Sequence, residues 1–170
     1  VWRTDREYFI DKYDKWSSYE PEEKGVLIVY GSMYGNTQKA AENLAMRLVE
    51  KGMSNITMYD ASKTHVSYLI ADAFKYSHIV LASATYNLNI YPPVENFIRD
   101  MKALNLQKRT VAVIENGTWA PRSGQLIREL LGEMKEMNVL DNKILIKSSM
   151  KEENVDEMEA LADNIIESMK

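Results

Sequence analysis

Short apolar runs alternate with longer amphipathic segments along most of this 170-residue chain. The apolar runs lie at residues 26–30, 56–59, 79–84, 110–114 and 144–146. Helical periodicity follows each of them, at residues 38–50, 66–76, 94–104, 124–137 and 155–169. Parallel strands need such crossover helices, and right-handed crossovers place helices on both faces of the sheet. The pattern predicts an α/β fold with a doubly wound sheet of five parallel strands.

The composition excludes several classes of site. The chain has 21 Lys and Arg against 25 Asp and Glu, a net charge of -4, and these charges are interspersed. We therefore expect no nucleic-acid partner, because a phosphate backbone requires a basic face. The chain has no Cys, which excludes disulfides and thiolate ligands. The two histidines, His65 and His78, have no ligand-spaced neighbours, so we expect structural roles for both and no metal site.

No apolar run reaches the length of a membrane span, and the first residues do not form a signal-peptide pattern. We therefore expect no membrane partner and a cytoplasmic location. The chain begins with Val1 rather than Met, so we expect it to be an excised part of a longer protein.

Residues 1–24 differ from the rest of the chain, since they are rich in aromatic and charged side chains and end in a turn signal at Pro21. Phe9, Tyr13 and Trp16 recur at helical spacing. We expect a short amphipathic helix that packs on its own domain, or failing that on a neighbour, followed by a linker. The main domain is then predicted at residues 25–170.

The loop after the first predicted strand has the composition of an anion site. Backbone N–H groups and the helix dipole favour an anion where a helix begins, and Ser32, Asn36 and Thr37 add side-chain donors. Gly35 allows the backbone to turn closely around a ligand. The loop contains no Lys or Arg, so it predicts a phosphate site without a side-chain cation. The alternative is an ordinary connection in which Asn36 or Thr37 only caps the helix.

Two further loops lie at the same predicted sheet edge, where ligands bind in doubly wound folds. Residues 83–93 read SATYNLNIYPP and residues 115–124 read ENGTWAPRSG. Both loops are long for strand-to-helix connections, and both combine aromatic rings with amides and hydroxyls. Such side chains suit a flat aromatic ligand with polar edges. Together the three loops predict a site for a mononucleotide whose base is a large ring system.

The aromatic side chains of these loops also have a structural interpretation. Tyr86 and Tyr91 fit scattered surface aromatics, and for Tyr91 the two interpretations are equally favoured. For Trp119 the ligand-binding interpretation is favoured, because a Trp between Gly117-Thr118 and Ala120-Pro121 is not expected to be buried in the core.

Other ligand-binding motifs are absent. No G-x-x-x-x-G-K-[ST] or G-x-G-x-x-G follows the first predicted strand, and the serine of G-S-M-Y-G is misplaced for a nucleophile elbow. A phospho-acceptor receiver domain shares the strand pattern but needs acidic residues where this chain has Gly31-Ser32 and Ala84-Thr85.

The chain resembles the flavodoxins over residues 24–170, and more narrowly the flavodoxin-type domain of the flavodiiron (A-type flavoprotein) family. The resemblance rests on SMYGNT at residues 32–37, SATYN at 83–87 and NGTWAP at 116–121. Val1-Trp2-Arg3 and residues 13–16, YDKW, are similar to the connector that joins this domain to the family's N-terminal β-lactamase-like domain. The resemblance implies a flavodoxin-like sheet with strand order 2-1-3-4-5 and an interdomain connector at residues 1–24.

The resemblance implies FMN as the cofactor. The residues implied to hold its phosphate are Ser32, Met33, Tyr34, Gly35, Asn36 and Thr37. One side of the isoalloxazine ring is implied to lie against Thr85, Tyr86, Asn87 and Leu88. The other side is implied to lie against Asn116, Gly117, Thr118, Trp119 and Ala120, with Trp119 as the ring that stacks.

In that family, FMN passes electrons from a donor such as rubredoxin to a di-iron site that reduces oxygen or nitric oxide. The ligands of that site belong to the β-lactamase-like domain, so we expect this chain to be an electron relay rather than a complete enzyme. The implied partners are that di-iron domain, in the same chain or a dimer mate, and a rubredoxin-type or NAD(P)H-dependent donor. Two alternatives stay open: a self-sufficient flavodoxin-like NAD(P)H:quinone reductase or nitroreductase, and a signalling or interaction domain without flavin.

Overall fold

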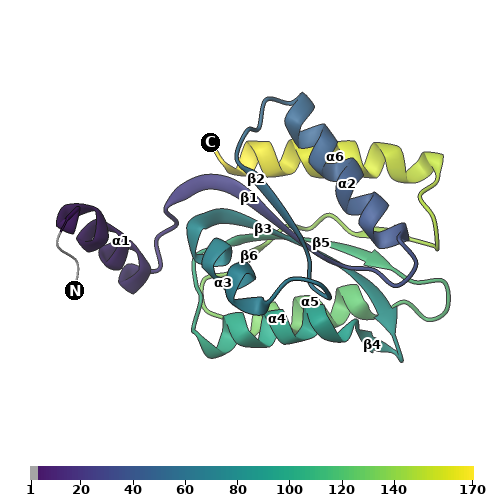
Figure 1. The fold of residues 1–170 in the computed structure, drawn as a ribbon. Helices are drawn as coiled ribbons and strands as arrows, with labels where there is room; N and C mark the ends of the chain where they lie inside the picture. The colour runs from purple at the N-terminus through teal and green to yellow at the C-terminus, as the bar shows by residue number, and fades with distance from the viewer. Residues whose placement is uncertain (1–3) are drawn as a thin grey trace.

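The computed structural model describes residues 4–170, which form one parallel sheet between two layers of helices and a projecting N-terminal helix (Figure 1). The strands run in the order β2-β1-β3-β5-β6, and β7 also pairs with β5. Their bounds are β1 (Glu23–Gly31), β2 (Ile56–Asp60), β3 (Tyr76–Tyr86), β5 (Thr110–Asn116), β6 (Asn138–Val139) and β7 (Ile144–Ile146). This order confirms the predicted doubly wound topology. Val1, Trp2 and Arg3, which carry part of the connector resemblance, lie outside the described residues.

The helices cover both faces of the sheet, as right-handed crossovers require. On one face lie α2 (Asn36–Glu50) and α6 (Glu152–Ser168), the upper pair in Figure 1. On the other lie α3 (Val66–Lys75), α4 (Pro92–Ala103) and α5 (Ser123–Gly132). Side chains of β1 alternate between the two cores: Val26 and Ile28 face α2 and α6, while Leu27 and Val29 face the other layer. The continuous apolar runs in the sequence arise because the central strands are buried on both faces.

The fifth strand position is divided in two. β6 pairs with the start of β5 and β7 pairs with its end. Arg128 of α5 bridges the interruption, donating hydrogen bonds to the carbonyls of Leu140 (2.8 Å) and Asn142 (2.6 Å). α5 itself ends at Gly132 rather than at residue 137 as predicted, because the chain turns there and Glu136 takes a left-handed φ of 53°.

A short hairpin extends the end of β3 and was not predicted. β4 (Asn89–Ile90) pairs antiparallel with Thr85 and Tyr86. Asn87 and Leu88 form the turn, with φ values of 49° and 59°. Two positive φ values are typical of the tight hairpin turns that match strand twist, but such turns are usually marked by glycine, which is missing here.

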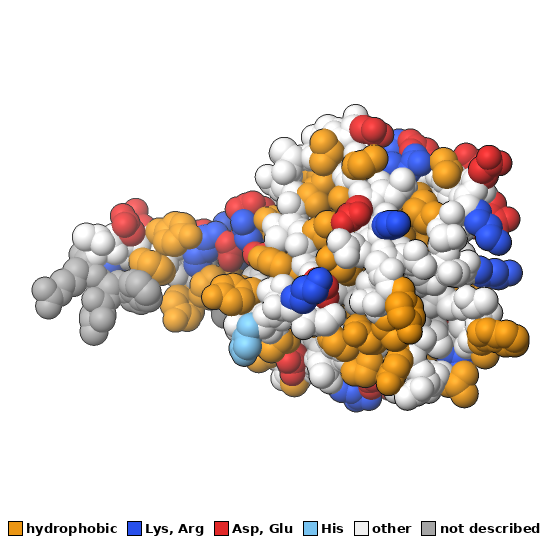
Figure 2. Space-filling model, turned by 45° about the vertical axis from the view of Figure 1, so that its right-hand side comes forward, with side chains coloured by type: hydrophobic (Ala, Val, Ile, Leu, Met, Phe, Trp, Pro, Cys, Tyr) orange, Lys and Arg blue, Asp and Glu red, His pale blue; other side chains and the backbone are white. Residues whose placement is uncertain are grey.

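The N-terminal helix α1 (Arg6–Ser18) projects from the body of the molecule, on the left of Figures 1 and 2. None of its residues is buried, and Tyr8, Ile10 and Tyr13 are exposed. The expectation that this helix packs on its own domain is therefore wrong. Its apolar side chains are spread around the helix, and it meets the domain at its C-terminal end, where Lys12 and Trp16 bond to Glu22.

Arg109 fixes the junction between α1 and the domain. This side chain is 1% exposed, and desolvation lowers its pKa to about 10. Its guanidinium donates to the carbonyls of Tyr19 (2.7 Å), Ala73 (3.0 Å), Phe74 (2.8 Å) and Gln107 (2.8 Å). The charge is therefore held by carbonyl dipoles from three parts of the chain.

Both histidines bond to serine hydroxyls. His65 caps α3, and its Nδ1 lies 2.8 Å from Ser67 Oγ. His78 begins the buried part of β3, with Ser77 Oγ 2.8 Å from Nδ1 and Ser168 Oγ 3.0 Å from Nε2. Burial lowers the pKa of His78 to about 4, and the nearby charge of Lys24 acts in the same direction.

Across residues 4–170, none of the helices has the length and apolar character needed to cross a bilayer.

Candidate functional site

The loops after β1 and β5 meet the end of β3 in one cavity of about 330 Å³ at the carboxyl edge of the sheet. Small-molecule sites commonly span about 300–1,000 Å³. The cavity is lined by Ser32, Met33, Tyr34, Asn36, Thr37, Ala84, Thr85, Asn116, Gly117, Thr118, Trp119 and Ser148. None of these side chains carries a charge.

The start of α2 forms one wall of the cavity. Gly35 occupies the N-cap position with φ 86°, a conformation that L side chains rarely adopt. Its N–H donates to Ser32 Oγ at 3.0 Å, which closes the loop on itself. Because first-turn N–H groups have no partner within a helix, the N–H groups at Asn36 and Thr37 provide donors for an anion at this wall.

Thr85, near the end of β3, ties the hairpin formed by β3 and β4 to the loop after β5. Its Oγ1 accepts hydrogen bonds from the backbone N–H groups of Arg122 (3.1 Å) and Ser123 (3.2 Å), at the start of α5. Its own hydroxyl lies 3.3 Å from Glu115 Oε1 and 3.2 Å from Ser123 Oγ. The two loops that frame the cavity are thus held together at its base.

Gly117 lies at a crowded point beside Thr85, where a larger side chain has little room. A Cβ at this position would lie 3.1 Å from both Thr85 Oγ1 and Pro121 Cβ. Its N–H donates to the carbonyl of Ile146 at 3.0 Å, and the buried Asn116 side chain donates to the carbonyl of Ser148 at 3.0 Å. These two bonds draw the loop after β7 to the cavity, where Ser148 becomes part of the wall.

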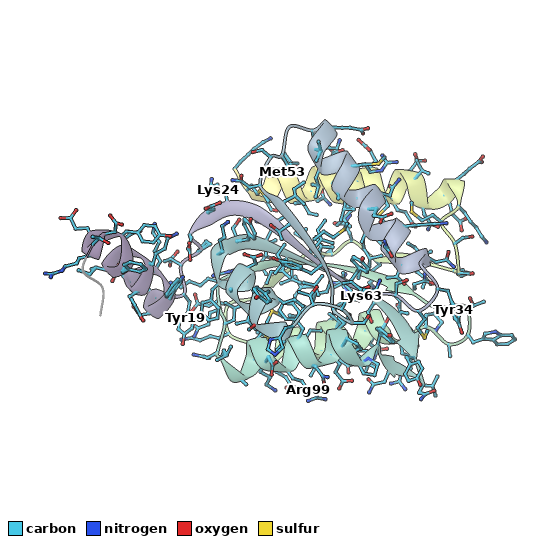
Figure 3. The ribbon with its side chains drawn as sticks, in the orientation of Figure 1. Tyr19, Lys24, Tyr34, Met53, Lys63 and Arg99 are labelled. Atoms are coloured by element: carbon cyan, nitrogen blue, oxygen red, sulfur yellow. The ribbon has the colours of Figure 1, made fainter. Side chains whose placement is uncertain are left out.

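The mouth of the cavity has exposed aromatic side chains. Tyr34 is 90% exposed and Trp119 is 87% exposed, although both line the cavity. Figure 3 shows Tyr34 at the end of the molecule opposite Tyr19 and α1. Aromatic rings at the rim of a cavity can contact the face of a flat ligand bound there.

Tyr91 has a packing role beside this site. Its ring covers Gly31, where an added Cβ would lie 2.5 Å from Tyr91 Cδ1. Tyr91 also meets Tyr86 edge-to-face, with ring centroids 6.1 Å apart. Tyr91 therefore holds the hairpin against the end of β1 rather than lining the cavity.

The structure brings most of the predicted site residues together. Those that line the cavity are Ser32, Met33, Tyr34, Asn36, Thr37, Thr85, Asn116, Gly117, Thr118 and Trp119. The others lie in the same loops without lining it: Gly35 at the helix cap, Tyr86, Asn87 and Leu88 in the hairpin, and Ala120 beyond Trp119. Sequence reasoning missed Ala84 and Ser148. Ala84 sits within a motif already singled out, but the sequence around Ser148 offers no comparable signal.

The cavity fits FMN in its chemistry. A phosphate group would meet the N-terminus of α2, and Gly117 leaves room between the segments that would flank a ring. Aromatic and amide side chains supply the other contacts that a flavin requires. In the described part of the chain, no group of His, Asp and Glu is arranged to hold a metal ion.

Comparisons with known proteins agree with this geometry. The profile of the flavodoxin domain family matches residues 27–144. A relative from Methanocaldococcus jannaschii, "Uncharacterized protein MJ0732", is 29% identical over 156 residues, covering 91% of this chain and 39% of that protein. The "Anaerobic nitric oxide reductase flavorubredoxin" of Vibrio vulnificus is 23% identical over 120 residues, covering 70% of this chain and 24% of the relative.

Among solved structures, the rubredoxin oxygen:oxidoreductase of Desulfovibrio gigas matches with a TM-score of 0.88 and 20% identity. The match covers 96% of this chain and 40% of that one. The chain thus spans less than half the length of these relatives.

Proposed function

Because the chain belongs to the flavodoxin domain family, we propose that its main domain, residues 25–170, binds FMN in the cavity at the carboxyl edge of the sheet. The observation that carries the proposal is that the polar loops after β1 and β5 meet the end of β3 in one uncharged cavity, which opens beside exposed aromatic rings.

The proposed phosphate contacts are at the start of α2, from Ser32, Met33, Tyr34, Gly35, Asn36 and Thr37. The isoalloxazine ring is proposed to lie between two loops, one contributing Thr85, Tyr86, Asn87 and Leu88, the other Asn116, Gly117, Thr118, Trp119 and Ala120. Thr85 bonds the end of β3 to the start of α5, and the exposed rings of Tyr34 and Trp119 at the cavity mouth are proposed to cover the bound flavin.

We further propose that this domain is an electron relay. Bound FMN supplies transfer of one or two electrons, while the protein orients the ring and sets its potential. The proposed donor is rubredoxin-type or NAD(P)H-dependent, and the proposed acceptor is a di-iron β-lactamase-like domain. Both are inferred from relatives of which this chain covers only a part.

The geometry of α1 supports a connector at residues 1–24. An isolated helix of 13 residues is marginal in water, so its exposed aromatic side chains favour a covering partner. α1 leaves the end of the molecule opposite the cavity (Figure 3). A domain attached through α1 therefore reaches the cavity only by folding back or from a second copy.

Titration of the protein with FMN tests the proposal directly. We expect saturable quenching of flavin fluorescence at one FMN per chain, and a yellow protein that releases FMN on heating. A protein that leaves flavin fluorescence unchanged would overturn the proposal of FMN binding.

Mixing the FMN-loaded protein with NAD(P)H distinguishes a relay from a self-sufficient reductase. The flavin of a relay stays oxidised until a donor protein is added, whereas the flavin of a self-sufficient reductase bleaches at once.

A further inference from the structure

Glu115 places a carboxylate near the end of a central strand, next to the proposed flavin cavity. It lies in β5, in register with Ser83 of β3 and Leu145 of β7. The residue is half-buried, on the face of the sheet covered by α5. Acidic residues are uncommon at interior positions of a parallel sheet, because burial of the charge is unfavourable without partners.

The partners of this carboxylate come from two elements at the cavity. Its Oε1 accepts from Thr85 Oγ1 and from Ser123 Oγ, each at 3.3 Å. Thr85 lies near the end of β3, just before the hairpin turn, and Ser123 begins α5 directly after the loop from β5. One carboxylate oxygen therefore joins the end of β3 to the start of α5.

The hydroxyl protons of Thr85 and Ser123 both need an acceptor. Thr85 Oγ1 already accepts from two backbone N–H groups, so its own proton has to be donated. Ser123 Oγ also lies 3.2 Å from the carbonyl of Ser83, to which it can donate. Thr85 Oγ1 also lies 3.2 Å from Ser123 Oγ. Among the described residues, Glu115 is the one acceptor within reach of both hydroxyls that carries a carboxylate oxygen.

Gly124 makes room for this carboxylate. A Cβ at residue 124 would lie 2.8 Å from Glu115 Oε2. The first turn of α5 therefore sits directly against the carboxylate, where the helix dipole favours a negative group.

We propose that Glu115 is a positioning residue for flavin binding, which acts by orienting Thr85 and Ser123 so that the two loops keep their separation. This inference rests on the proposed function. Glu115 itself lies behind the cavity wall, facing a second cavity of about 680 Å³ beside α5.

The test compares FMN affinity and the visible circular dichroism of bound flavin in three variants. Glu115→Ala removes the acceptor, and we expect about tenfold weaker binding and an altered dichroism band, a loss typical of one well-placed hydrogen bond. Glu115→Gln keeps an acceptor oxygen, so we expect affinity within about twofold of the unaltered protein and a restored band. Glu129→Gln is the matched control, because Glu129 lines the same second cavity from α5 and bonds to Gln125, and we expect no change.

Equal affinity and dichroism in Glu115→Ala and the unaltered protein would overturn the inference, as would a Gln variant as weak as the Ala variant. Should Glu115→Ala fail to fold, Ser123→Ala replaces it: loss of one hydroxyl should weaken binding by about threefold, and no loss would overturn the inference. If the unaltered protein itself does not bind FMN, the proposed function fails instead.

Discussion

Arg109 donates a hydrogen bond to the carbonyl of Tyr19 at 2.7 Å, joining residues 90 positions apart in the sequence. The same guanidinium holds the end of α3, so a buried cation attaches the segment that follows α1 to the domain, together with the ring contact between Tyr19 and Phe74.

Replacing Arg109 by Met should destabilise the protein strongly. Several buried carbonyls would lose their donor, and we expect the free energy of unfolding to fall by about 3 kcal/mol. Urea unfolding measures this directly. Arg99→Met is the control, because Arg99 makes an exposed ion pair with Glu95 and its loss should change stability by less than about 0.5 kcal/mol. Similar midpoints for the two variants would contradict the assigned role of Arg109.

His78 should make stability depend on pH. Its pKa in the folded protein is about 4, below the ordinary histidine value of 6.5, so the unfolded state binds more protons between these values. The stabilisation is fully present well above pH 6.5 and is lost as the pH falls toward 4, by about 3 kcal/mol. We expect His78→Gln to show a smaller loss over this range in denaturant unfolding at each pH. Parallel curves for the two proteins would rule out this contribution.

Gly132→Ala should stabilise the protein. Gly132 lies in the last turn of α5, and nothing lies within 4 Å of an added Cβ. Alanine restricts the unfolded chain, so we expect a gain of about 0.5–1 kcal/mol. Gly52→Ala is the opposite case: its φ of +89° should make the same substitution unfavourable by about 1 kcal/mol. Thermal unfolding of both variants distinguishes these effects.

Trp119 should contribute to flavin binding by ring stacking. Trp119→Ala removes an exposed ring at the cavity mouth, and we expect about fivefold weaker FMN binding with partial recovery of flavin fluorescence. Trp16→Phe is the control, since Trp16 lies in α1 at the opposite end of the molecule. An unchanged affinity in Trp119→Ala would remove this residue from the proposed site.

The two-electron potential of bound FMN should lie below that of the free cofactor. The side chains that line the cavity carry no positive charge, so negative charge added on reduction is not offset by them. Redox titration at pH 7 measures the difference. Thr118→Lys places a cation at the cavity wall and should shift the potential upward; a higher potential in the unaltered protein than in free FMN would contradict the argument.

Much of the fold follows from periodicity. β1 is predictable because residues 26–30 form a continuous apolar run between two glycines. α2 is predictable because the side chains that it buries recur at helical spacing. β4 is not predictable, since Asn87-Leu88 takes a turn that normally requires glycine. The exposure of α1 also lies beyond the pattern, because aromatic side chains at helical spacing do not specify what covers them.

The candidate site is predictable where its residues follow a strand directly. Ser32 to Thr37 and Asn116 to Trp119 are of this kind, because parallel strands end at one edge. Ser148 is different: it reaches the cavity through the amide of Asn116, a contact between distant parts of the chain. The arrangement of Glu115 with Thr85 and Ser123 is likewise a matter of distances that no linear motif encodes.

The division of the outer strand into β6 and β7 has a consequence for solubility. An uninterrupted border strand exposes a row of unpaired amides that can recruit strands from other molecules into aggregates. Here the outer strand consists of β6, with two residues, and β7, with three. The segment between them is held by the hydrogen bond from Arg128 to the carbonyl of Leu140. No long template for intermolecular pairing exists on this side of the domain, so it is protected against edge-to-edge aggregation by its shape.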